Sequence, residues 1–230
     1  MPVIWIIGDS TVEDNRPPFR GWGWALPKYL LDTVPVRNLA LSGRSTRSFW
    51  DQGLFSLAEQ GMQKGDILLI QFGHNDEKDT PDLHTDPDST YPEFLMRYCN
   101  IAREKGALPV LMTPVSRRFF VGGGSLLYTH GEYPRAVREL AAREQIPLCD
   151  LKKDSRALYI SLGEEATAAL FVRLAPGEHP DFPEGHDDKT HFNAGGATII
   201  AGLVAKELRS IPECAVLLKD ENEFPHTERA

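Results

Sequence analysis

The sequence predicts a doubly wound α/β protein, in which helices cover both faces of a parallel sheet. Short apolar runs recur along the chain, separated by intervals long enough for one helix each, which is the pattern of such sheets. The first run is nearly continuous, as expected for a parallel strand that is buried on both faces. The predicted strands are Val3–Ile7, Val36–Ala40, Asp66–Phe72, Leu108–Thr113 and Pro147–Asp150.

The length of the chain fits one medium-sized domain. A chain of 230 residues buries roughly 70% of its unfolded surface and needs no disulfide or metal to hold its core. No internal repeat or low-complexity tract is present. We therefore expect a single domain over residues 1–210, followed by a polar and acidic tail over residues 211–230 in which only Ala215–Leu218 is apolar.

The first predicted strand ends at Gly8-Asp9-Ser10-Thr11. In open parallel sheets, ligands and reactive groups lie just beyond the carboxyl ends of the strands, and Gly8 permits a sharp exit from the strand. Ser10 is thus a candidate nucleophile. The alternative is an ordinary turn in which Asp9 or Ser10 caps the segment that follows.

Four helices are predicted from apolar side chains at helical spacing. Pro27 is tolerated only in the first turn of the first helix. The second helix begins with the capping-box pattern Thr90-Tyr91-Pro92-Glu93 and stops at Gly106, and Asn193 is the expected N-cap of the last helix. The four segments are Gly23–Leu31, 90–106, Tyr133–Gln145 and Ala194–Arg209.

Three segments lack a regular pattern and are expected to be irregular and to lie at the carboxyl side of the sheet, near Ser10. Glu77–Ser89 is rich in Asp, Pro and Thr. Val115–Glu132 carries three consecutive glycines between two apolar clusters and resembles a hairpin. Leu174–Lys189 contains several prolines and glycines. These segments shape any pocket over Ser10, so the substrate-binding residues stay unassigned at this stage.

The charge and cysteine content exclude several classes of protein. The net charge is −8, and no basic cluster would neutralise a phosphate backbone, so nucleic acid is not an expected partner. No apolar run is long enough to span a bilayer, and no signal-peptide pattern follows Met1. Cys99, Cys149 and Cys214 are widely spaced beside apolar residues, which favours free buried thiols in a reducing compartment. We expect a cytoplasmic protein with no membrane partner, and its oligomeric state is not predicted.

Polar residues follow the second and third predicted strands and precede the last helix. Gly43 follows the second strand, where a glycine can bring a backbone N–H close to a ligand. Asn75 follows the third strand and can direct its amide to the same point. Asp188 and His191 are three residues apart, which lets a carboxylate hold one imidazole nitrogen while the other faces outward. Taken singly, each has an ordinary alternative as a turn-forming or structural residue.

Together these residues provide the groups that acyl transfer requires. A serine hydroxyl needs an adjacent base at neutral pH; His191 is the expected base, and Asp188 would fix its tautomer and stabilise the imidazolium. The oxyanion of the tetrahedral intermediate needs donors, each worth roughly 3 kcal/mol in the transition state. The expected donors are the backbone N–H groups of Ser10 and Gly43 and the side-chain amide of Asn75. No cofactor or metal is required.

Four blocks of the sequence, in this order, resemble the SGNH (GDSL-type) hydrolase superfamily. The blocks are Gly8-Asp9-Ser10, Gly43, Gly73-x-Asn75-Asp76 and Asp188-x-x-His191. Ser10, Gly43, Asn75 and His191 match the four signature residues of the superfamily, and the resemblance spans nearly the whole chain. It implies a three-layer α/β/α fold with a flavodoxin-like, five-stranded parallel sheet. It also implies ester hydrolysis through an acyl-serine intermediate.

Further motifs resemble the rhamnogalacturonan acetylesterase branch, which removes acetyl groups from the sugars of pectin. They are Thr11 after the Gly-Asp-Ser block, Ser42–Ser45 with Phe49, Thr113–Val115 with Arg117-Arg118, and Thr190–Phe192. Since the chain shows no export signal, the resemblance implies that the substrate is a short acetylated oligosaccharide inside the cell. Arg44 and Arg117 are candidates to pair with galacturonate carboxylates; the alternative for each is a surface salt bridge.

Three other functions remain open. The first is an SGNH esterase acting on another small acyl ester. The second is a metal-dependent hydrolase, for which no ordered ligand spacing is present. Its candidate ligands are His179, His186, Asp187, Asp188 and His191, together with Asp9. The third is a non-catalytic sugar-binding module, which would have no chemical need for the Ser, His and Asp set.

Overall fold

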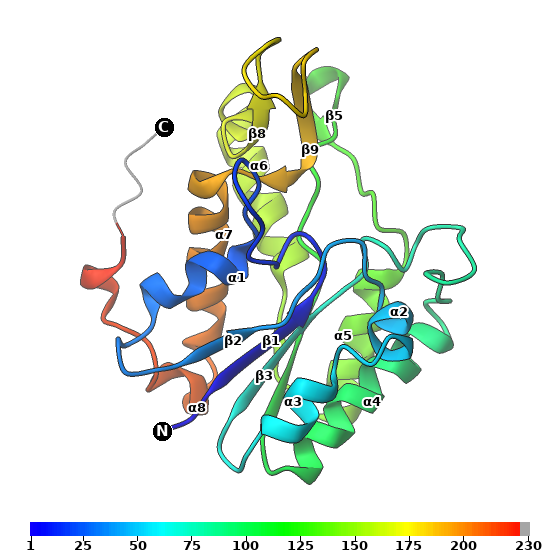
Figure 1. The fold of residues 1–230 in the computed structure, drawn as a ribbon, viewed down its shortest axis with the longest axis vertical. Helices are drawn as coiled ribbons and strands as arrows, with labels where there is room; N and C mark the ends of the chain where they lie inside the picture. The colour runs from blue at the N-terminus through cyan, green and yellow to red at the C-terminus, as the bar shows by residue number, and fades with distance from the viewer. Residues whose placement is uncertain (226–230) are drawn as a thin grey trace.

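The computed structural model describes residues 1–225, and a five-stranded sheet lies at its centre (Figure 1). The order across the sheet is β2-β1-β3-β4-β7, and every neighbouring pair runs parallel. This is the flavodoxin-like order, so the predicted fold is confirmed. The strands are β1 (Ile4–Gly8), β2 (Val36–Asn38), β3 (Ile67–Gln71), β4 (Leu108–Met112) and β7 (Leu148–Cys149).

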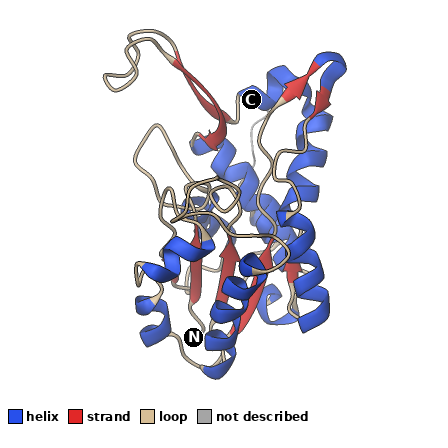
Figure 2. Ribbon diagram, turned by 90° about the vertical axis from the view of Figure 1, so that its right-hand side faces the viewer, coloured by secondary structure: helices blue, strands red, loops and turns tan. Residues whose placement is uncertain are grey.

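Helices cover both faces of the sheet because successive side chains of a strand point to opposite sides. Ile4 and Ile6 pack in one apolar cluster, and Trp5 and Ile7 pack in another. Figure 2 shows the strands between helices on either side. The first face is covered by α1 (Trp22–Ala25), α6 (Leu151–Ala168) and α7 (Ala194–Leu208), and the second by α2 (Thr46–Asp51), α3 (Ser56–Gly61), α4 (Thr90–Glu104) and α5 (Tyr133–Glu144).

Three of the four predicted helices are confirmed as α4, α5 and α7. Gly106 follows α4 with a φ of +74°, and the side chain of Asn193 caps α7 by accepting a hydrogen bond from the Gly196 N–H at 2.9 Å. The remaining predicted helix, over residues 23–31, does not form as one continuous helix. Residues 23–25 belong to the one-turn helix α1, and a 3₁₀ turn follows at Leu26–Tyr29. Pro27 lies in the first positions of that turn, where its missing N–H costs least.

The prediction that a capping box opens α4 is wrong. Thr90 is the first helical residue rather than the cap, and Ser89, which precedes it, makes no side-chain cap hydrogen bond. The Thr90 hydroxyl instead accepts a hydrogen bond from the Asp86 N–H at 2.8 Å. The side chain therefore closes the loop before the helix, which is a common alternative use of threonine.

The irregular segments had different outcomes. The hairpin in 115–132 is confirmed, as β5 (Phe120–Val121) and β6 (Ser125–Leu126) pair antiparallel. The expectation that 174–189 is irregular is wrong in part. β8 (Phe171–Leu174) and β9 (His186–Phe192) form an antiparallel ribbon, which rises above the carboxyl edge of the main sheet in Figure 1. β9 is mostly half-buried and charged, so its sequence lacks the apolar alternation that predicts a strand.

Part of the segment expected as a tail packs onto the molecule. Ile211, Cys214, Leu217 and Leu218 are buried and join the first apolar cluster, around a short helix α8 (Pro212–Ala215) and before a 3₁₀ turn at 221–223. Residues 226–230 lie outside the described residues, and the division at residue 210 stays a prediction. No helix within residues 1–225 is long and apolar enough to cross a membrane.

Candidate active site

The turn after β1 places Ser10 at the carboxyl edge of the sheet. Packing requires glycine at position 8, because a Cβ there would lie 2.6 Å from the carbonyl oxygen of Gln71 on the neighbouring strand. Asp9 is fully buried and accepts hydrogen bonds from the Thr11 backbone N–H at 3.0 Å and the Thr11 hydroxyl at 2.8 Å. The backbone is therefore fixed on both sides of Ser10.

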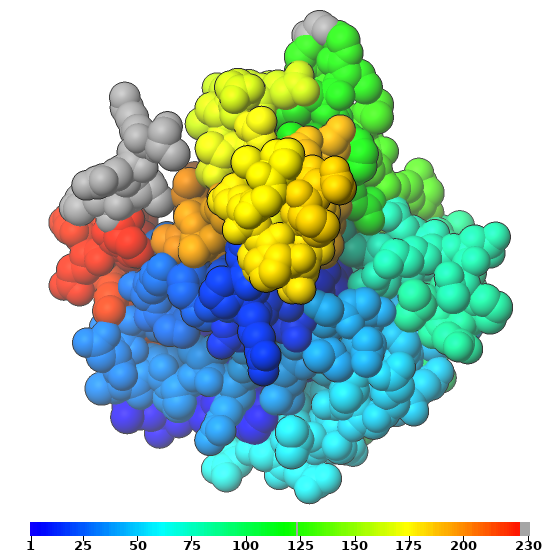
Figure 3. All heavy atoms as spheres, turned by 45° about the horizontal axis from the view of Figure 1, so that its top comes forward, coloured from blue at the N-terminus to red at the C-terminus, as the bar shows by residue number. Residues whose placement is uncertain are grey.

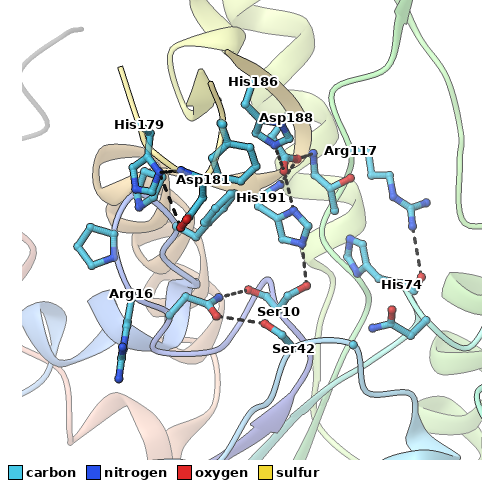
Figure 4. Close-up of a pocket in the computed structure, with 18 of the residues that line it drawn as sticks. Ser10, Arg16, Ser42, His74, Arg117, His179, Asp181, His186, Asp188 and His191 are labelled. Carbon is cyan, nitrogen blue, oxygen red and sulfur yellow. Dashed lines mark hydrogen bonds and ion pairs between the residues drawn. The ribbon is translucent and has the colours of Figure 1, made fainter. Parts of the chain in front are cut away.

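Ser10, His191 and Asp188 form a continuous chain of hydrogen bonds (Figure 4). Ser10 Oγ lies 2.9 Å from His191 Nε2, and His191 Nδ1 lies 2.8 Å from Asp188 Oδ2. Asp188 and His191 belong to β9, which Arg118 anchors by donating from Nε to the Asp188 carbonyl oxygen at 3.0 Å. The structure thus brings together the three residues that the sequence predicts as nucleophile, base and supporting carboxylate.

The surroundings of Asp188 favour its charged form. Burial alone would raise the pKa of this carboxyl group, but hydrogen bonds from the His191 ring and from the backbone N–H groups of His191 (2.8 Å) and Thr190 (2.6 Å) hold the pKa well below its usual range. A carboxylate beside Nδ1 favours the tautomer in which Nε2 carries no proton. In that tautomer, Nε2 is able to accept the Ser10 proton.

Three hydrogen-bond donors lie at the same cavity as Ser10. The backbone N–H groups of Ser10 and Gly43 donate to no other group within residues 1–225, and Gly43 has a φ of +75°, which glycine adopts without strain. Asn75 Nδ2 donates one hydrogen to the Arg44 carbonyl oxygen at 3.0 Å, and Asn75 Oδ1 accepts from Lys78 Nζ at 2.7 Å. The second hydrogen of Nδ2 is left available for a ligand.

A cavity of about 770 Å³ opens over Ser10. Figure 3 shows that the connection between β8 and β9, in yellow, lies over the dark-blue N-terminal segment at this face. Phe19 joins the two segments, with its ring centroid 5.9 Å from that of Phe182 and 5.8 Å from that of His191. One wall of the cavity is therefore aromatic. Lys78 and Arg117 also line the cavity.

The two arginines considered from the sequence are engaged with protein groups. Arg44 donates to Gln52 Oε1 at 2.9 Å and to the Ser42 carbonyl oxygen at 2.8 Å, and it does not line the cavity. Arg117 lines the cavity but forms an ion pair with Glu77 at 2.5 Å. The geometry therefore favours the salt-bridge alternative for Arg117 and a local hydrogen-bonding role for Arg44.

The six candidate metal ligands do not all converge on one point: His186 and His191 both contact Asp188, but the other three lie elsewhere. Asp9 lies beneath the site with its Oδ2 3.3 Å from His74 Nδ1, and Asp187 pairs with Arg118. His179 contacts Asp181, at 3.9 Å. Within residues 1–225, no group of three His, Cys, Asp or Glu side chains is placed to hold a metal ion. The metal-dependent alternative thus lacks a ligand set in this part of the chain.

Sequence reasoning missed the contacts that hold the loops of the site together. Asn15 Nδ2 donates to the Ser10 carbonyl oxygen at 2.9 Å, and the Ser42 hydroxyl donates to Asn15 Oδ1 at 3.1 Å, which ties the loop after β1 to the loop after β2. The buried contact between Asp9 and His74 ties the first of these to the loop after β3. These partners are far apart in sequence, and the only signal was their position after successive strands.

Comparisons with known proteins agree with this geometry. The sequence profile of the GDSL-like lipase/acylhydrolase family matches residues 6–199. The chain is 42% identical to the rhamnogalacturonan acetylesterase RhgT of Bacillus subtilis over 220 residues, covering 94% of this chain and 92% of the relative. It is 36% identical to the probable rhamnogalacturonan acetylesterase YesY of the same organism, covering 90% of this chain and 93% of the relative.

Solved structures match the same fold. The crystal structure of protein YxiM from Bacillus subtilis superposes with a TM-score of 0.77 at 29% identity, covering 91% of this chain but only 56% of that protein. An acetyl-xylooligosaccharide esterase from Geobacillus superposes with a TM-score of 0.61 at 18% identity, covering 90% of this chain and 93% of that one. At that identity, the second likeness supports the fold alone.

Proposed function

The chain belongs to the GDSL-like lipase/acylhydrolase family, and we propose that it is a serine esterase that removes O-acetyl groups from rhamnogalacturonan oligosaccharides. The observation that carries the proposal is the hydrogen-bonded chain from Ser10 through His191 to Asp188 at the base of a cavity. The names of two relatives, with identities of 42% and 36% over most of the chain, support the choice of substrate.

The reaction begins at Ser10. Its Oγ attacks the carbonyl carbon of the acetyl ester as its proton passes to His191 Nε2, 2.9 Å away. The tetrahedral intermediate collapses when His191 returns this proton to the sugar oxygen, so that the sugar leaves and an acetyl-serine remains. His191 then takes a proton from a water molecule as the water oxygen attacks the acetyl carbon. The second tetrahedral intermediate collapses when His191 returns this proton to Ser10 Oγ, which breaks the acyl–oxygen bond, releases acetate and restores the free serine. The negative charge of Asp188 stabilises the imidazolium in both halves of the reaction.

The oxyanion of each tetrahedral intermediate is stabilised by Ser10 N–H, Gly43 N–H and Asn75 Nδ2. Two of these donors are backbone groups without another partner in the described chain. The third is oriented by Lys78, because only the amide oxygen of Asn75 can accept a hydrogen bond from an ammonium group. Preorganised donors of this kind cost no rearrangement when the charge develops.

The cavity suits part of an oligosaccharide. Its volume of about 770 Å³ is within the range of small-molecule sites, and its exposed Lys78 is a cation that could pair with a uronate carboxylate. The alternative that stays open is hydrolysis of another small acyl ester by the same serine.

The proposal is tested by acetate release from acetylated rhamnogalacturonan oligosaccharides, acetylated xylooligosaccharides and an aryl acetate. Wild-type protein should release acetate from the first and the third, and Ser10→Ala should lower both rates by about 10⁴-fold or more, because the nucleophile is lost. Ser161→Ala, an exposed serine on α6, is the matched control and should retain the wild-type rate. Circular dichroism of each variant checks that it is folded.

The other outcomes discriminate among the alternatives. Release from the aryl acetate alone would support the serine chemistry but reject the rhamnogalacturonan substrate. A higher kcat/KM on the acetylated xylooligosaccharides than on the rhamnogalacturonan oligosaccharides would indicate that the natural substrate is a neutral polysaccharide. No release that depends on Ser10 would reject the esterase. In that case, binding of the oligosaccharide equally well by wild type and Ser10→Ala would support the non-catalytic module.

We also propose that the protein acts in the cytoplasm. All three cysteines are free and buried, which fits a reducing compartment. Recovery of the native protein in the cytosolic fraction of its source cells would support this location, whereas recovery in the medium would contradict it.

A further inference from the structure

Two imidazole rings share one oxygen of the active-site carboxylate. Asp188 Oδ2 lies 2.8 Å from His191 Nδ1 and 3.1 Å from His186 Nε2, and Figure 4 shows His186 above Asp188, on the side away from Ser10. The other oxygen, Oδ1, accepts from the backbone N–H groups of Thr190 and His191. The second imidazole is not needed to complete the chain from Ser10 to Asp188.

The ring of His186 is held in place by aromatic neighbours. It stacks on Phe182, with centroids 4.6 Å apart and planes at 28°, and it meets the ring of Phe19 edge-on at 6.0 Å. Residues 186 and 188 are two apart on β9, so their side chains point to the same face of the strand. The His186 side chain is also 32% exposed and lines the cavity, which lets it exchange protons with solvent.

We propose that His186 is a positioning residue that limits the basicity of His191 through their shared carboxylate oxygen. A second donor on Oδ2 withdraws charge that would otherwise stabilise the His191 imidazolium, and a proton on His186 adds repulsion between two cations on one carboxylate. Both effects make His191 a weaker base. They keep His191 unprotonated, and so able to act as a base, to lower pH than Asp188 alone would allow. The consequence for catalysis rests on the proposed function, whereas the effect on His191 itself does not.

Other charged or titratable groups surround the cavity, and most of them are engaged away from Asp188. Those that line it are Arg16, His74, Lys78, Arg117, His179 and Asp181. On the ribbon and the segment after β4, Asp187 pairs with Arg118 and Arg173, and Lys189 lies over the ring of Phe119. Within residues 1–225, only the side chains of His186 and His191 form a hydrogen bond with the carboxylate of Asp188.

Two substitutions separate the hydrogen bond of His186 from its charge. His186→Phe keeps a flat aromatic ring against Phe182 but removes the donor and the charge. His186→Gln places an amide N–H near the position of Nε2, so it keeps a donor that never carries a charge. His179→Phe is the matched control, because His179 also contacts the ring of Phe182 (5.7 Å) and lines the cavity but contacts Asp181 instead of Asp188.

The direct measurement is an NMR titration of the His191 ring, assigned by comparison with His191→Gln. In His186→Phe, the midpoint of this titration should move to higher pH by about 0.5–1 unit relative to wild type, since a donor and a potential cation are removed from the carboxylate. His186→Gln should shift it by less, and His179→Phe should leave it in place. An unchanged or lowered midpoint in His186→Phe would overturn the proposal.

The acid limb of kcat/KM for acetate release gives the second readout. In His186→Phe, this acid limb should move to higher pH together with the NMR midpoint. At a pH below the midpoint of either protein, kcat/KM of the variant should therefore be about 3–10-fold lower than that of wild type. A shifted NMR midpoint in a protein that never hydrolyses esters would leave the inference standing and reject the proposed function. Normal hydrolysis with no shift in either readout would do the reverse.

Discussion

At the residue scale, the site depends on side chains whose polar ends are each held by a specific partner. Asn75 is an example, because Lys78 holds its amide oxygen and the Arg44 carbonyl holds one of its two amide hydrogens. An asparagine side chain is ambiguous between oxygen and nitrogen unless its partners decide. Here both partners agree on one orientation, which leaves the remaining N–H for the cavity.

We predict that Asn75→Ala lowers kcat by about 10²–10³-fold with little change in KM, because the amide stabilises charge that exists only in the transition state. Steady-state kinetics on the aryl acetate measure both constants. Asn100→Ala, an exposed asparagine on α4, is the control and should behave as wild type. A rise in KM at constant kcat would instead make Asn75 a residue that binds the substrate in its ground state.

At the element scale, His191 is placed by the junction between β9 and α7. Asn193, two residues after His191, accepts from Gly196 N–H as the cap of α7 and donates from Nδ2 to the carbonyl oxygens of Ala169 (2.8 Å) and Phe171 (3.0 Å). One side chain therefore links the first turn of the helix to the start of the ribbon. Phe192, between the two residues, is fully buried.

We predict that Asn193→Ala lowers the free energy of unfolding by about 1–2 kcal/mol, because the cap and two further hydrogen bonds are lost. For a chain of this size, the melting temperature should fall by roughly 2–8 °C. Asn193→Asp keeps the acceptor of the cap but loses both donors, so it should lie between Asn193→Ala and wild type. Thermal unfolding measures all three, and equal melting temperatures would remove the junction as a source of stability.

The elements that were predicted from the sequence are those whose own residues carry the pattern. The buried parallel strands are apolar along their length, so β1 and β3 were found almost to the residue. α6 was not predicted, since Gly163, with a φ of +76°, interrupts it and divides its apolar positions. β9 was missed because the residues of β9 are mostly polar and its strand partner, β8, lies on the other side of a loop.

The same distinction applies to the site. Ser10, Gly43 and Asn75 follow strands that pattern could locate, and the spacing of Asp188 and His191 indicated their pairing. His186 was considered only as a metal ligand, because its contact with Asp188 depends on both residues lying on one face of a strand that was not predicted. Contacts of this kind are set by tertiary structure rather than by local sequence.

At the scale of the whole molecule, a buried basic cluster lies beneath the active site. His74 and His130 meet edge to face with ring centroids 4.4 Å apart, and His130 Nδ1 lies 2.7 Å from Lys152 Nζ. Burial, together with the charges of His74 and Lys152, holds the pKa of His130 well below its usual value. Lys152 is only 1% exposed, and burial, with smaller effects from Arg117 and Arg156, lowers its pKa to about 7.

We predict that Lys152 makes the stability of the whole molecule depend on pH. Its pKa is about 7 in the folded protein against the usual value of 10.5, so between these values the unfolded chain binds a proton that the folded chain does not. The contribution of Lys152 to stability therefore rises with pH through this window, and its full penalty applies below about pH 7. Denaturant unfolding measures the free energy of unfolding of wild type and of Lys152→Met. Between pH 7 and 9.5, this free energy should rise by about 3 kcal/mol more in wild type than in Lys152→Met. Lys153→Met, a substitution at an exposed neighbour on α6, is the control, and its free energy of unfolding should vary with pH in parallel with that of wild type. If the curve of Lys152→Met also ran parallel to wild type, Lys152 would be charged in the folded protein throughout this range, which would contradict the prediction.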